Sequence, residues 1–135
     1  MHEVIIWKED ILMKMKRAAS VFSIFMGLSM LGMWTMFYLS GSIPELVTKP
    51  MEISMHIVAE LLTAVMLIVG GIGVLVDKKW GRKIYFVSMG MLLYTLIVSP
   101  GYYIQRGNIG FVAMFAVFFV ISIIFLRLML SADKP

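Results

Sequence analysis

Residues 51–70 read MEISMHIVAELLTAVMLIVG, an apolar run that nevertheless carries three ionisable side chains. As a helix, the run is long enough to cross a hydrocarbon core of about 30 Å. Its ionisable residues, Glu52, His56 and Glu60, are spaced at i, i+4 and i+8, which places them on one helix face. Ionisable groups in hydrocarbon are costly and usually functional, so this polar stripe is a candidate site.

The rest of the chain has the composition of a membrane protein. Of its 135 residues, 61% are hydrophobic and only 15% are charged, whereas soluble domains average about 25% charged residues. We therefore predict an all-α fold, an integral membrane four-helix bundle forming a single four-span domain. The predicted spans are residues 18–39, 51–76, 84–104 and 109–130. The chain has no cysteine, which excludes disulfides and thiolate metal sites within it.

The basic residues are distributed asymmetrically between the two sides of this predicted bundle. Only Lys49 and Arg106 fall on one side. The other ten of the twelve Lys and Arg residues fall on the opposite side: Lys8, Lys14, Lys16, Arg17, Lys78, Lys79, Arg82, Lys83, Arg127 and Lys134. The positive-inside rule then predicts a multi-pass protein with both termini in the cytoplasm. Because topology explains the net charge of +4, we expect the lipid bilayer, and no nucleic acid, as a partner.

Residues 2–17 mix apolar and charged positions ahead of the first span. Val4, Trp7 and Ile11 can share one helical face. This spacing predicts a short N-terminal interfacial amphipathic helix on the inner leaflet. The alternative is a basic leader whose only role is to orient the chain.

Small residues predict where helices approach closely. Ser20, Ser23 and Gly27 lie along one flank of the first span, and Gly70, Gly71 and Gly73 end the second. These glycines lack the Lys and Ser/Thr residues of a phosphate loop, so close packing is the better interpretation. In the third span, Pro100 removes a backbone donor and is expected to kink or end the helix.

Depth matching suggests neighbours for the polar stripe. Glu60 lies nine residues after Met51, about 13 Å into the bilayer at 1.5 Å per residue. The third span runs the other way, so Tyr94 and Thr95 reach a similar depth and Ser99 lies above them. The predicted substrate- or ion-binding residues are therefore Glu52, His56, Glu60, Tyr94, Thr95 and Ser99. We expect them to line a cavity that opens to the outside and narrows toward Glu60.

This set of residues suits several chemistries. Burial favours the neutral form of a carboxyl group, and a nearby histidine can exchange a proton with it, which gives a relay along the stripe. His56 and Glu60 could also serve as metal ligands with help from other residues or a second subunit. A divalent metal would suit them, and the thioethers of Met51 and Met55 would favour copper. Haem is disfavoured, because the only other histidine, His2, precedes the first span.

Three functions remain open from the sequence. The leading hypothesis is proton- or cation-linked transport or binding through an outward-open intramembrane His/Glu site. The second is a small membrane enzyme, or a metal- or haem-binding subunit, that uses His56 and Glu60 on a lipophilic substrate. The third is a non-catalytic subunit of a larger membrane complex, in which His56 and Glu60 only fix helix packing. A homo-oligomer is expected, because a bundle of this size can hardly enclose a wide cavity alone.

Overall fold

The computed structural model describes residues 1–132, and every regular element within them is helical, as predicted. These elements are α1 (His2–Leu39), α2 (Glu45–Thr48), α3 (Pro50–Leu75), α4 (Lys79–Gln105) and α5 (Ile109–Ala132). All except the short α2 are long and apolar enough to cross a membrane. This agrees with the prediction of a multi-pass membrane protein. Lys134, one of the basic residues used to predict orientation, lies outside the described residues.

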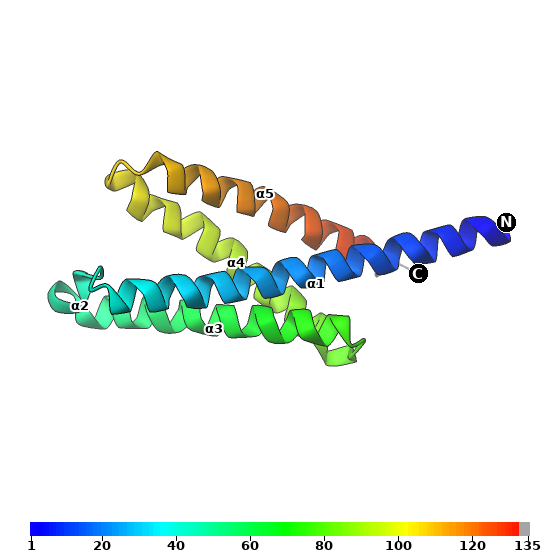
Figure 1. Ribbon diagram of the computed structural model, residues 1–135, viewed down its shortest axis with the longest axis horizontal. Coiled ribbons are helices and arrows are strands. Elements are labelled where there is room, and N and C mark those ends of the chain that lie inside the picture. Colours follow the sequence, from blue (N-terminus) through cyan, green and yellow to red (C-terminus); the bar gives the residue numbers. More distant parts are fainter. Residues whose placement is uncertain (133–135) are drawn as a thin grey trace.

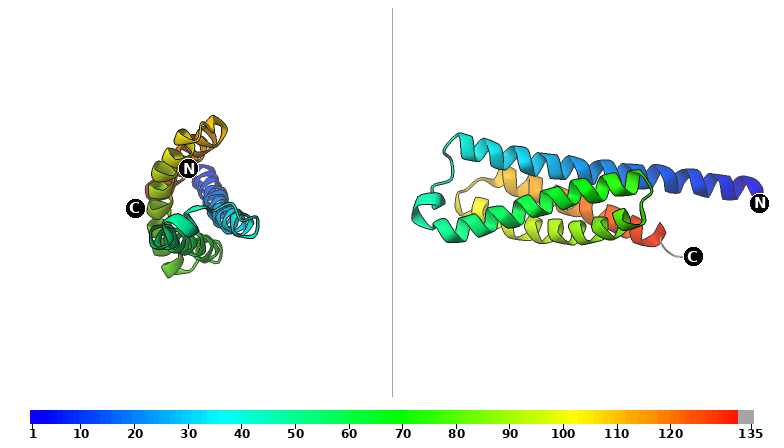
Figure 2. Two further views of the ribbon diagram at one scale, coloured as in Figure 1. Left: turned by 90° about the vertical axis from the view of Figure 1, so that its left-hand side faces the viewer. Right: turned by 90° about the horizontal axis from the view of Figure 1, so that it is seen from below.

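The long helices run alternately up and down and pack in the order α1, α3, α4, α5 (Figure 1). One end of the molecule holds α2 and the α4–α5 connection, and we call it the α2 end. The opposite end, which we call the turn end, holds the α3–α4 connection (Figure 2). In Figure 1 the α1–α3 pair and the α4–α5 pair diverge toward the α2 end. Nearer the turn end α1 contacts α5, where the rings of Phe22 and Phe125 lie 5.2 Å apart.

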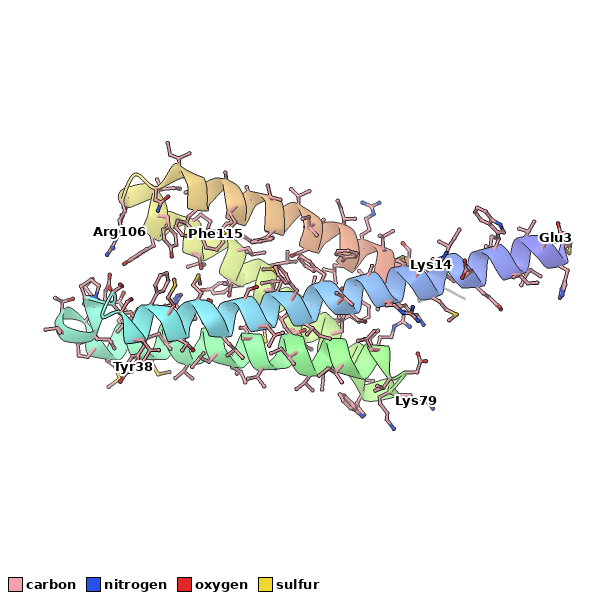
Figure 3. The ribbon with its side chains drawn as sticks, viewed as in Figure 1. Glu3, Lys14, Tyr38, Lys79, Arg106 and Phe115 are labelled. Atoms are coloured by element: carbon pink, nitrogen blue, oxygen red, sulfur yellow. The ribbon has the colours of Figure 1, made fainter. Side chains whose placement is uncertain are left out.

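The N-terminal segment corrects one prediction. Residues 2–17 do not form a separate interfacial helix but are the first part of α1, which runs unbroken from His2 to Leu39. No proline or glycine occurs in α1 before Gly27, and extending a helix costs far less than starting a new one. The segment consequently projects beyond the other helices at the turn end, carrying Glu3 and Lys14 (Figure 3).

α4 begins earlier than the sequence predicted, and Pro100 does not end it. It begins at Lys79, earlier than the predicted start at residue 84, and it continues through Pro100 to Gln105. Pro100 therefore does not end the helix. A proline removes one backbone hydrogen bond, and neighbouring helices and local adjustments make that loss tolerable in apolar helices.

Small residues allow the helix backbones to approach closely. A Cβ atom added at Gly73 of α3 would lie 2.5 Å from the Cα atom of Gly81 in α4, closer than real Cβ atoms come. On the other side of α3, the buried Ser23 hydroxyl of α1 donates a 2.7 Å hydrogen bond to the backbone carbonyl of Leu67. The predicted packing role of these small residues is confirmed. This packing fixes how α1 and α4 face α3.

Candidate functional site

The polar stripe of α3 leads inward to one buried carboxyl group. Glu60 is only 5% exposed, and Thr95 of α4 is 8% exposed. The Thr95 hydroxyl donates a 2.9 Å hydrogen bond to Oε1 of Glu60. The predicted proximity of these two residues is therefore found in the structure. The bond joins α3 to α4 and fixes the orientation of the carboxyl group within the bundle.

Two ring side chains lie beside this carboxyl group. His56 is one helical turn from Glu60 toward the α2 end, on the same face of α3. Trp34 of α1 packs edge-on against the His56 ring, with centroids 5.9 Å apart. Its indole Nε1 also lies near Glu60, although no described acceptor meets it at standard hydrogen-bond geometry. The site is thus built from α1, α3 and α4.

Sequence reasoning missed Trp34. From its position toward the end of the first span, Trp34 reads as an interfacial aromatic residue. A signal was nevertheless present, because the small-residue flank of Ser20, Ser23 and Gly27 continues at the same three- and four-residue spacing to Met30 and Trp34. Extending that flank would have placed the indole on the face that packs against α3.

The other predicted site residues do not converge on Glu60 to the same degree. Tyr94 is 70% exposed and faces away from the bundle, since it is offset by about 100° from Thr95 on the same helix. Ser99 is partly buried. Glu52 is exposed, and its carboxylate lies 3.8 Å from the Lys49 ammonium group. Glu52 therefore belongs to the surface at the α2 end.

In the described part of the chain, the fold does not bring a complete set of metal ligands together. Within residues 1–132, no group of three or more His, Asp or Glu side chains is placed to hold a metal ion. His56 and Glu60 alone supply two ligands, whereas zinc sites use three or four. Neither of the two best-defined hollows on the described part of the chain reaches Glu60, because both lie toward the turn end.

An ion pair connects the two diverging helix pairs at the α2 end. Arg106, between α4 and α5, lies 3.3 Å from Oε1 of Glu45 in α2. The Arg106 guanidinium also stacks over the Tyr102 ring, 4.1 Å from its centroid. Figure 3 shows Arg106 at this end, on the side of α4 and α5. The contact therefore joins the end of the α4–α5 pair to the segment that connects α1 with α3.

Comparison with known proteins gives a family but no activity. A family model described as a domain of unknown function, DUF8058, matches residues 13–135. No curated protein and no solved structure matches the chain. The matched residues include every member of the site described above and leave out only the first part of the projecting segment of α1.

Proposed function

Because the chain belongs to the DUF8058 family, whose description assigns no activity, we propose a function from the site itself: proton-linked transport across a membrane, with the Glu60 carboxyl group as the proton-binding centre. The observation that carries this proposal is the burial of Glu60 against the Thr95 hydroxyl, 2.9 Å from Oε1. Ionisable groups within membrane helices are rare and mark ion pathways and proton relays, which makes a buried carboxyl group a functional-site hypothesis by default.

The surroundings of Glu60 suit a group that changes its protonation state. An ionised carboxylate in an apolar interior is costly unless nearby groups compensate it. The Thr95 hydroxyl and the His56 ring provide partial compensation, and the Trp34 indole offers a further donor close by. In the proposed mechanism the carboxyl group exists in both forms, and these neighbours compensate the charge of the ionised form.

The polar stripe supplies a route toward the α2 end. Glu52, His56 and Glu60 succeed one another at four-residue intervals, about 6 Å apart along the helix axis. That spacing is too long for direct proton transfer, so each step requires a bridging water molecule. Glu52 is exposed and would exchange protons with the aqueous phase, while His56 would relay them to Glu60.

Orientation follows from the distribution of charge. We propose that the α2 end faces the outside, because most of the basic residues lie toward the turn end and would remain in the cytoplasm. Glu52 would then collect protons from the outer surface. The Glu45–Arg106 ion pair would lie at the same surface, between the two helix pairs.

We also propose that the protein acts as a homo-oligomer. Tyr94 presents its hydroxyl outward near the middle of α4, where the surrounding solvent would be hydrocarbon. A polar group without a partner in that solvent is unfavourable, and interhelical hydrogen bonds commonly satisfy it. A second copy packed against this face of α4 would shield the hydroxyl.

Proton flux into liposomes tests the function. The purified chain is reconstituted with a pH-sensitive dye inside, potassium and valinomycin to balance charge, and an acid pulse outside. We expect the wild type to acidify the lumen faster than empty liposomes. Glu60→Gln, which keeps the side-chain shape but cannot release a proton, should reduce the rate to that of empty liposomes.

Two further variants make the result specific. Glu9→Gln makes the same chemical change on the exposed, projecting part of α1 and should leave the flux unchanged. Glu52→Gln should slow the flux without abolishing it, because other routes for water remain at the surface. A wild-type rate no faster than empty liposomes, or a Glu60→Gln rate equal to the wild type, would overturn the proposal.

A further inference from the structure

A pocket at the turn end gathers positive charge from three parts of the chain. Lys16 comes from α1, Lys78 from the α3–α4 connection, and Lys79 and Arg82 from the first turn of α4. Among the described residues, Asp77 is the only acidic one in its lining. We call this the basic pocket. Figure 3 labels Lys79 at this end.

The fold, and not only the local sequence, brings these cations together. Arg82 donates a 3.2 Å hydrogen bond to the backbone carbonyl of Met129 in α5, which holds its guanidinium between α4 and α5. The Met129 side chain is fully buried and lines the pocket floor. Lys16 is separated from Lys78 by more than sixty residues, yet both line the same hollow because α1 packs against α3.

The lysines of the pocket are not paired within the described part of the chain. Among residues 1–132, Lys16, Lys78 and Lys79 form no ion pair. α4 also begins here without a side-chain cap, so the positive end of its helix dipole adds to the same region. Like charges held together in one hollow repel each other, and an anion is the ligand that would relieve the repulsion.

We propose that the basic pocket binds a phosphate-bearing anion. Phosphate offers several strong acceptors to Lys and Arg donors, and clusters of such residues at the membrane surface attract anionic headgroups. The same chemistry is presented by an anionic phospholipid and by a soluble phosphate compound. The pocket is separate from the Glu60 site, so this proposal stands or falls independently of proton transport.

The test uses the full chain in nanodiscs made either of phosphatidylcholine alone or of phosphatidylcholine with phosphatidylglycerol. Native mass spectrometry measures retained phosphatidylglycerol, and calorimetry in the neutral nanodiscs measures binding of inorganic pyrophosphate. The variant is Lys16→Gln combined with Lys79→Gln. At roughly 1 kcal/mol for each lysine near a surface, the pair should weaken binding by about 30-fold.

A matched double variant separates a pocket from general surface charge. Lys8→Gln with Lys83→Gln removes the same charge at the same end of the molecule, but neither residue lines the pocket. It should weaken binding only slightly. Retention of phosphatidylglycerol alone identifies a lipid headgroup as the ligand, and binding of pyrophosphate alone identifies a soluble phosphate.

Equal losses in the two double variants would overturn the proposal, as would the absence of binding by both probes. Monodisperse elution and an unchanged helical circular dichroism spectrum are required of each variant, so that a loss of binding is not a loss of fold. Both substitutions lie on exposed or partly exposed side chains, which makes retention of the fold the expected result.

Discussion

Thr95→Val probes the contact on which the candidate site depends. Valine keeps the branched shape of threonine but cannot donate a hydrogen bond to Oε1 of Glu60. Because the Thr95 side chain is only 8% exposed and that of Glu60 only 5%, little solvent is available to replace the lost donor. The substitution should therefore destabilise the protein and do so through Glu60.

The size of the effect follows from the 2.9 Å geometry and the apolar setting. Interhelical hydrogen bonds in membrane proteins contribute about 0.6 kcal/mol on average and about 1.7 kcal/mol at most. We expect a coupling free energy in that range between Thr95→Val and Glu60→Gln, equivalent to about a 3-fold to 20-fold change in the unfolding equilibrium constant. A value near the upper limit would indicate an acceptor with ionic character.

The assay is a double-mutant cycle measured by steric trapping in bicelles, in which the wild type, both single variants and the double variant are unfolded reversibly. Thr63→Val provides the control, because the buried Thr63 hydroxyl donates to the Ala59 carbonyl within its own helix. It should couple to Glu60→Gln more weakly than Thr95→Val does, because Thr63 makes no hydrogen bond to Glu60. A Thr95 coupling no larger than that of the Thr63 control would refute the proposed geometry of the site.

Three further predictions concern packing, the α2 end and assembly. Gly81→Ala should destabilise the protein by about 1–3 kcal/mol in the same unfolding assay, because its Cβ atom would press on the α3 backbone. Gly90→Ala is the control: its Cβ atom would meet nothing within 4 Å, so its stability should be close to that of the wild type. Arg106→Gln should cost about 1 kcal/mol or less, since its ion pair with Glu45 is half exposed, and a stability loss of several kcal/mol would contradict this. Tyr94→Cys should give a disulfide-linked dimer on a non-reducing gel after mild oxidation in membranes, with no background because the chain has no other cysteine; monomer alone would count against the α4 interface.

Hydrophobic periodicity and charge predicted the number of long helices but not how the first one begins. Four long apolar runs require four helices, because no other element satisfies its own backbone within hydrocarbon. The sequence determines less clearly whether a helix boundary falls at residue 17, between the N-terminal segment and the first span. Amphipathic spacing in residues 2–17 is compatible with a separate surface helix or with a continuous one, and the absence of a helix breaker before Gly27 decides in favour of continuity.

Depth within the bilayer predicts which residues lie at the same level, but it does not predict which face of a helix meets its neighbour. Tyr94 and Thr95 lie at nearly the same depth as Glu60, yet adjacent residues on a helix point about 100° apart, so only one of them can face α3. The structure selects Thr95 and turns Tyr94 outward. Which face of α4 meets α3 depends on the contact between Gly73 and Gly81, which a single-helix pattern does not reveal.

The most direct test of the central claim is an infrared titration of the reconstituted protein, because it observes the carboxyl group without requiring a substrate. We expect the carbonyl stretch of a protonated carboxyl group to disappear reversibly as the pH is raised. Because the chain has eight Asp and Glu residues, Glu60→Gln should lack one such band that both the wild type and Glu9→Gln retain. A spectrum of Glu60→Gln that matches the wild type at every pH would contradict the account, because Glu60 would then not be a group that gains and loses a proton.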